Sequence, residues 1–130
     1  MTENEKFRRN SDALIYAIAA WGERHGINNP DRQTVKLLEE CGELAHEISR
    51  KQYDSKALED AIGDIGVVLI ILADILDYDF ADCLLLAYNE IKDRKGKTID
   101  GGFVKEEPKS EDERVNYQSY KGGIKWLKQA

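Results

Sequence analysis

Hydrophobic and polar positions along most of the chain follow the periods of four successive helices. Apolar residues recur at three- and four-residue steps, and Pro30 and several glycines fall between the periodic stretches. We therefore expect helices over roughly 3–25, 30–51, 55–76 and 80–95. Candidate caps stand at three of the helix starts: Asn28 or Asn29, Asp54 or Ser55, and Asp79. Gly26 and Gly96 are expected to end the first and fourth helices. The pattern predicts an all-α, four-helix bundle.

The third predicted helix has a middle section, IGVVLIILA at 65–73, that is apolar on every side. Such a helix is buried all round, inside a bundle or at an oligomer interface. Because the section is rich in β-branched residues, a buried strand is the competing interpretation. The length of the segment and the lack of turn residues around it favour a helix. We expect the protein to form a homodimer or homotetramer.

The pattern changes after Gly96. The DGG sequence between Ile99 and Phe103 predicts a small hairpin or tight turn laid on the bundle. EEPKSEDER has the composition of a solvated linker, whereas the apolar residues near the C-terminus predict a docked segment. We expect residues 1–106 to form the helical domain and 107–130 to dock on the bundle or on a neighbouring subunit.

Composition narrows the function classes. A chain of 130 residues fits one domain, and a net charge of −6 argues against binding to nucleic-acid polymers or membrane surfaces. A nucleotide remains compatible with this charge, because a metal ion reverses the local sign of an acidic site. The N-terminal residues lack the apolar core of a signal peptide, and no apolar stretch is long enough to span a bilayer. We expect a cytoplasmic protein, with Cys41 and Cys83 as buried free thiols.

Carboxylates follow one side of the second predicted helix. Lys36, Glu40, Glu43 and Glu47 stand three or four residues apart and therefore share a face. Beside this line runs an apolar seam made of Leu37, Cys41, Leu44 and Ile48. At about 100° per residue, Glu40 lies nearest to the seam. This pattern alone fits a solvated acidic stripe as well as a functional site.

Asp64 changes that balance, because it lies in the apolar part of the third predicted helix. Burying an ionised carboxylate costs several kcal/mol unless the charge is paired. No basic residue stands between Lys56 and Lys92, so the same helix offers no partner. A divalent cation shared with Glu40 and Glu43 would satisfy all three groups. The alternative is an ion pair with a lysine or arginine of another helix.

The ligand types indicate which metal the site would take. Oxygen ligands alone suit Mg²⁺ or Mn²⁺. His46 stands three residues after Glu43, as in di-iron bundles, but such bundles need two of these steps and His25 has no glutamate three residues before it. We therefore interpret His46 as a partly exposed helix residue.

Three glycines stand within the helices near these carboxylates: Gly42, Gly63 and Gly66. Each costs about 1 kcal/mol relative to alanine in a helix. We expect them to let the second and third helices approach closely, either to share a metal or for ordinary tight packing.

At these residues the chain resembles the MazG-like nucleotide pyrophosphohydrolases, an all-α family with Glu-x-x-Glu on one helix and Glu-x-x-Asp on the next. KLLEECGELA supplies the first pair as Glu40 and Glu43, and IGDIGVVLIILA supplies the final aspartate as Asp64. YNEIKDRKGK and GGFVKE are similar to the end of the fourth helix and the following turn of small members. The resemblance spans roughly 21–106.

One position departs from the family pattern. Ala61 stands where the second motif has its glutamate. Asp60, one turn before Asp64, could reach the same site, and otherwise water would fill the coordination position, which Mg²⁺ tolerates. The departure leaves the expected fold and site unchanged but puts the activity in question.

The resemblance implies Mg²⁺-dependent hydrolysis of a nucleoside triphosphate to the monophosphate and pyrophosphate. Glu40, Glu43, Asp64 and Asp60 would hold the metal, and Glu39 or Glu43 would act as general base. Asn89 and Lys92 match an Asn-x-x-Lys of the family. With Arg94 and Lys95 they are candidates to bind phosphate, although cations are common at helix C-termini. Trp21 or Tyr88 could stack on the base, and core packing explains either as well.

Two other functions stay open at this point. The alanine at position 61 is compatible with a weakly active or inactive MazG-fold module that binds nucleotides or a partner. A purely structural helical protein, assembled through its third helix, is the other. The structural protein predicts no change in stability with Mg²⁺, whereas converging carboxylates predict stabilisation.

Overall fold

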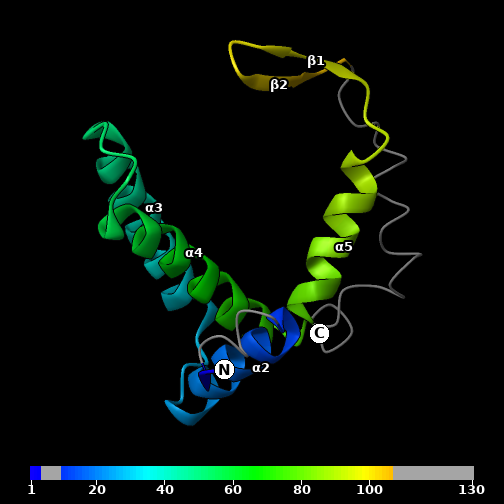
Figure 1. The fold of residues 1–130 in the computed structure, drawn as a ribbon. Helices are drawn as coiled ribbons and strands as arrows, with labels where there is room; N and C mark the ends of the chain where they lie inside the picture. The colour runs from blue at the N-terminus through cyan, green and yellow to red at the C-terminus, as the bar shows by residue number, and fades with distance from the viewer. Residues whose placement is uncertain (4–9, 107–130) are drawn as a thin grey trace. The chain divides into compact units, whose positions relative to one another are not determined.

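The structure is a computed structural model that describes residues 1–3 and 10–106 (Figure 1). Within these residues it contains four helices and a two-stranded antiparallel hairpin: α2 (Ser11–Arg24), α3 (Pro30–Ser49), α4 (Lys56–Ile75), α5 (Phe80–Ile91), β1 (Gly96–Ile99) and β2 (Gly102–Lys105). The predicted all-α fold is confirmed. The chain divides into two compact units, Met1–Cys83 and Leu84–Ala130. The predicted C-terminal extension, 107–130, and most of the expected helix before Asn10 lie outside the described residues.

Side-chain caps fix the starts of the helices. Asn29 accepts hydrogen bonds at Oδ1 from the backbone N–H groups of Asp31 and Arg32, and Pro30 opens α3. Ser55 caps α4 through the N–H of Leu58, and Asp79 caps α5 through the N–H of Asp82. Gly26 follows α2 with a φ of 67°. These predicted caps are confirmed, and they fix where α3 and α4 begin.

In the first unit, α3 and α2 both pack on α4. Among the described residues, the buried apolar side chains all belong to α4: Leu58, Ala61, Val68, Ile70, Ile71 and Ala73. None of the residues at 65–73 is exposed, which confirms a helix enclosed by neighbours over this stretch. Gly22 of α2 lies directly against Ile71, since a Cβ at position 22 would come within 3.2 Å of its side chain.

The predicted apolar seam of α3 is only half right. Leu37 and Leu44 are partly buried, whereas Cys41 and Ile48 are exposed. The buried residues of this helix are Gln33 and Glu40. Gln33 donates from Nε2 to the backbone oxygen of Val68 at 3.2 Å, which ties the two helices together. The face of α3 that carries its carboxylates is therefore rotated toward α4. Glu40 lies within the contact between the two helices and not at the margin of that contact.

The expectation for Gly42, Gly63 and Gly66 is wrong. Among the described residues, no neighbouring group lies within 4 Å of a Cβ built at any of the three. All three positions look into open space, because α3 and α4 meet on other faces. The close approach at a glycine occurs instead between α2 and α4.

Residues after α5 also differ from expectation. The helix ends at Ile91, four residues before the predicted end, and Gly96 begins β1 instead of capping a helix. A Cβ at Gly96 would collide with the ring of Phe103 across the hairpin, so the strand pair requires glycine there. Asp100 and Gly101 have φ of 50° and 78°, as a two-residue hairpin turn needs. The predicted hairpin itself is confirmed.

Neither cysteine forms a disulfide; Cys41 is exposed and Cys83 is partly buried. The expectation of two buried thiols is wrong, and for Cys41 the reason is the rotation of α3 described above. Among the described residues, no helix combines the length and apolar character needed to cross a bilayer.

Candidate metal centre

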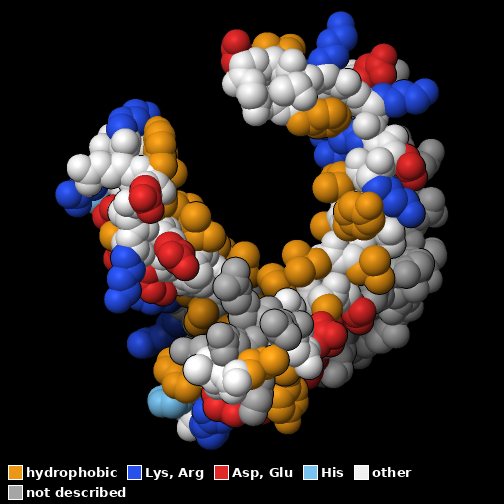
Figure 2. Space-filling view, in the orientation of Figure 1, with side chains coloured by type: hydrophobic (Ala, Val, Ile, Leu, Met, Phe, Trp, Pro, Cys, Tyr) orange, Lys and Arg blue, Asp and Glu red, His pale blue; other side chains and the backbone are white. Residues whose placement is uncertain are grey.

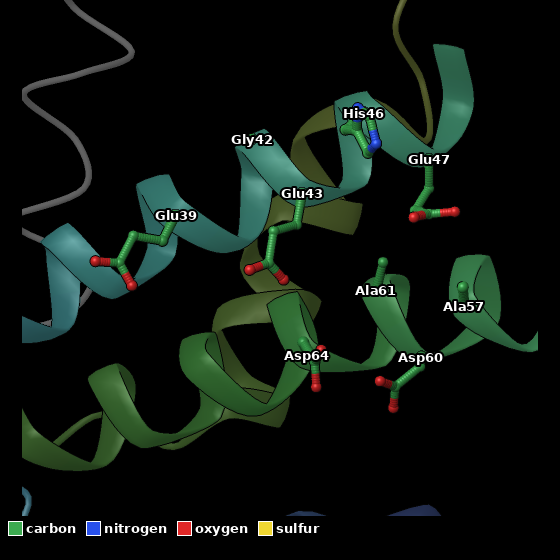
Figure 3. Close-up of a pocket in the computed structure, with 9 residues that line it drawn as sticks. All are labelled: Glu39, Gly42, Glu43, His46, Glu47, Ala57, Asp60, Ala61 and Asp64. Atoms are coloured by element: carbon green, nitrogen blue, oxygen red, sulfur yellow. The ribbon is translucent and has the colours of Figure 1, made fainter. Parts of the chain in front are cut away.

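Three carboxylates from two helices converge where α3 packs on α4. Glu40 and Glu43 of α3 and Asp64 of α4 each offer one oxygen, and these oxygens lie within 4.8 Å of one another. Figure 3 shows the Glu43 side chain extending from α3 toward the part of α4 that carries Asp64. Two oxygens bound to one Mg²⁺ lie at most about 4.2 Å apart. Small side-chain rotations would therefore bring all three onto one ion.

Glu40 is the most buried of the three carboxylate residues, with only 5% of its surface exposed. Oε1 pairs with Lys36 Nζ at 2.9 Å, while Oε2 is buried and has no hydrogen-bond partner among the described residues. A buried carboxylate oxygen without a partner is costly, because its water has been removed and nothing replaces it. The donor set therefore fits a divalent cation, which would be the partner that Oε2 lacks.

The cluster repels itself electrostatically. The neighbouring Glu40 carboxylate, followed by partial desolvation, raises the pKa of Glu43. Desolvation, followed by the charges of Asp60 and Glu40, raises the pKa of Asp64. Asp64 makes no ion pair with any described residue, so the alternative of a basic partner from another helix is not what the structure shows. A cation in the cluster would relieve the repulsion that favours protonation.

A cleft of about 590 Å³ opens beside the carboxylates (Figure 3). Its lining comes entirely from α3 and α4: Glu39, Gly42, Glu43, His46, Glu47, Ala57, Asp60, Ala61 and Asp64. Glu39 and Asp60, both predicted site residues, line the cleft without belonging to the converging set. Ala61 is buried on α4, where the family pattern has glutamate. Glu47 lines the cleft, as its place on the helix face of Glu43 allows, although it was not predicted as a site residue. His46 also lines the cleft, and its three-residue spacing from Glu43 is the signal that could have indicated this.

The predicted substrate residues are not among those that line this cleft. Trp21 on α2 packs its ring 4.3 Å from the ring of His25 and does not line the cleft. Asn89, Lys92, Arg94 and Lys95 belong to the second unit, and Arg94 and Lys95 line a cleft of about 530 Å³ with the hairpin. Because α5 ends at Ile91 and not at 95 as expected, Lys92, Arg94 and Lys95 follow the helix instead of lying on it. The roles of these residues stay predictions.

Comparison with known proteins agrees with this geometry. Residues 29–98, more than half of the chain, match the family model of the MazG nucleotide pyrophosphohydrolase domain. The chain belongs to the MazG family. The match runs from the cap of α3 into β1 and so contains all three converging carboxylates.

One curated relative of this MazG protein comes from Haemophilus phage HP1 (strain HP1c1) and is called an uncharacterized 18.2 kDa protein in the rep-hol intergenic region. The two are 38% identical over 63 residues, which cover 46% of this chain and 37% of the phage protein. The matched segment thus spans little more than a third of that relative. No solved structure matches the chain.

Proposed function

We propose that this MazG protein is a Mg²⁺-dependent nucleoside triphosphate pyrophosphohydrolase that releases a nucleoside monophosphate and pyrophosphate. The observation that carries the proposal is the convergence of Glu40, Glu43 and Asp64, with one buried Glu40 oxygen left unpaired. The match of this segment to the MazG domain supports the reaction class. The acidic chain favours free nucleotides over nucleic-acid polymers or membranes, and we expect it to act in the cytoplasm.

Residue roles follow from position in the cleft. Bound Mg²⁺, or Mn²⁺ in its place, would offset the phosphate charge and acidify a water molecule. Glu40, Glu43 and Asp64 would hold the ion. Glu39 lines the cleft outside the converging set, where one of its oxygens lies 3.6 Å from Lys36 Nζ, and it is one candidate to accept a proton from the attacking water. Glu43 is the other candidate base, because it lines the same cleft and its carboxylate reaches the converging set.

Asp60 would compensate in part for the missing glutamate at position 61. It lines the same cleft and is close enough to Asp64 to raise the pKa of that carboxyl. We propose that Asp60 completes the coordination of the metal, directly or through a water molecule. An Asp60→Asn variant should then bind the metal more weakly while keeping its fold.

The substrate must also meet positive groups, since its phosphates and the cleft carboxylates are both anionic. We propose that Asn89, Lys92, Arg94 and Lys95 bind the phosphates and that Trp21 contacts the base. These residues are exposed or partly exposed, so a substrate can reach them.

Product analysis tests the proposal. Canonical and modified deoxynucleoside triphosphates are incubated with the full chain and Mg²⁺ or Mn²⁺, and the products are separated by ion-exchange chromatography. We expect monophosphate and pyrophosphate in equal amounts from at least one substrate. Glu43→Gln should lower kcat about 100-fold or more, because it removes a metal ligand or the base. The matched control Glu59→Gln, on an exposed position of α4, should retain activity. Release of diphosphate and orthophosphate would contradict the proposed reaction.

A second candidate function rests on Ala61. A MazG-fold module with weak or no catalysis would bind the nucleotide and metal without releasing pyrophosphate. Calorimetric binding of a triphosphate by the wild-type protein, together with no product over long incubation, would favour this module.

A further inference from the structure

Lys36 lies at the edge of the candidate metal centre and contacts only one of the two carboxylate oxygens of Glu40. Its Nζ is 2.9 Å from Glu40 Oε1 and 3.6 Å from an oxygen of Glu39. Glu40 Oε2 is buried and has no partner among the described residues. The Lys36 ammonium group thus pairs with Oε1 of Glu40, and Oε2 is available to bind a cation.

We propose that Lys36 keeps Glu40 a one-oxygen ligand and thereby makes the centre prefer Mg²⁺ to Ca²⁺. The inference rests on the metal centre of the proposed function. Mg²⁺ takes six ligands in near-octahedral geometry at short distances, so it suits carboxylates that offer single oxygens. Ca²⁺ takes six to eight ligands and readily accepts both oxygens of one carboxylate. An ammonium group on Oε1 removes the two-oxygen mode at Glu40.

Burial makes this arrangement persistent. The Glu40 side chain is 7% exposed and has little room to turn Oε1 away from Lys36, which is itself 52% exposed. A lysine placed four residues before a glutamate is the less favourable order on a helix. The pair therefore depends on the buried carboxylate needing a counter-charge more than on the helix geometry.

A simple charge effect makes a different prediction. Lys36 repels any divalent cation in the centre, and that repulsion is the same for Mg²⁺ and Ca²⁺ at equal distance. Removing the charge alone would strengthen binding of both ions by the same factor. Freeing Oε1 would add a ligand for Ca²⁺ only. The ratio of the two affinities therefore separates a role in selecting the metal from a general electrostatic role.

Titration calorimetry of the full chain with Mg²⁺, Mn²⁺ and Ca²⁺ provides the test. In Lys36→Met, which keeps most of the aliphatic stem, we expect the affinity for Ca²⁺ to rise on the order of ten-fold more than that for Mg²⁺. Arg32→Gln is the matched control: it removes one positive charge from an exposed position on the same helix. The control should leave the ratio of affinities within about two-fold of wild type.

An unchanged Ca²⁺-to-Mg²⁺ ratio in Lys36→Met, with both ions still bound, would overturn the role of Lys36 but leave the metal centre standing. Failure of the wild-type protein to bind any of the three ions would overturn the centre itself, and the proposed function with it. Circular dichroism establishes that each variant is folded, and Lys36→Gln replaces Lys36→Met if the methionine variant does not fold.

Discussion

Glu40 stands on the packed face of α3, at a depth where helices ordinarily place leucine or alanine. An unpaired buried charge destabilises a protein by several kcal/mol, so the residue needs compensation. Lys36 compensates one oxygen, and a cation would compensate the other. Stability and metal binding are therefore coupled at this residue. A cation present at about 100 times its Kd adds about 2.7 kcal/mol to the free energy of unfolding.

The pH dependence of stability follows from the raised pKa values of Glu43 and Asp64. The folded, metal-free protein binds these protons more tightly than the unfolded chain does. Stability from this source is present below the ordinary carboxyl pKa of about 4 and is lost as the pH rises through the raised values. We expect urea unfolding in EDTA to show this loss and an Asp64→Asn variant to show less of it. If the metal-free wild-type protein instead gained stability relative to Asp64→Asn as the pH rose through this range, the repulsion within the cluster would be contradicted.

Sequence could predict which three carboxylates converge but not the depth of Glu40. The three-residue spacing of Glu40 and Glu43, and the lone carboxylate in an apolar segment at Asp64, are local signals. The rotation of α3 is not local, because it depends on which face of α4 lies opposite. That rotation exposes Cys41 and buries Gln33, against the apolar pattern.

Between elements, Gln33 links α3 to α4 through the backbone oxygen of Val68, one turn after Asp64. A Gln33→Glu substitution would bury a carboxylate that faces a carbonyl oxygen. We expect it to lower the free energy of unfolding at pH 7 by about 2–4 kcal/mol. The cost should fall near pH 4, where the protonated acid can donate the same hydrogen bond. The chemically identical change at an exposed site, Gln52→Glu, should stay within about 0.5 kcal/mol of wild type in urea titrations.

A substitution at Gly63, whose surroundings are open, is expected to raise the free energy of unfolding. A methyl group there meets no neighbour within 4 Å, so Gly63→Ala gains helix propensity without a clash. We expect an increase in stability of about 0.5–1 kcal/mol, measured by thermal or urea unfolding. Destabilisation would show that the glycine is needed for a close helix contact after all.

Caps and turns were the most predictable features of the elements, because each depends on a few adjacent residues. Asn29, Ser55 and Asp79 cap their helices as expected, and the Asp100–Gly101 turn closes the hairpin. The end of α5 was not predictable, since Gly96 suits a helix C-terminus as well as a strand. The strand is favoured by Phe103, whose ring packs over Gly96 from the opposite strand of the hairpin.

For the whole molecule, the apolar surface left on α3 favours self-association. Leu38 is 66% exposed, and Cys41 and Ile48 are also exposed. Figure 2 shows hydrophobic side chains along the visible surface of α3 and α4. We expect a homodimer or homotetramer by light scattering coupled to gel filtration. Leu38→Lys should shift the mass toward the monomer, while Gln52→Lys should not. A monomeric wild-type protein at micromolar concentration would contradict this expectation.

The central claim is that one divalent cation lies between Glu40, Glu43 and Asp64. Anomalous diffraction from crystals soaked in Mn²⁺ tests it most directly. The account predicts a strong anomalous peak about 2.2 Å from one oxygen of each residue, and its loss in an Asp64→Asn variant. A peak elsewhere, or no peak with Glu40 Oε2 paired to a basic side chain instead, would contradict it.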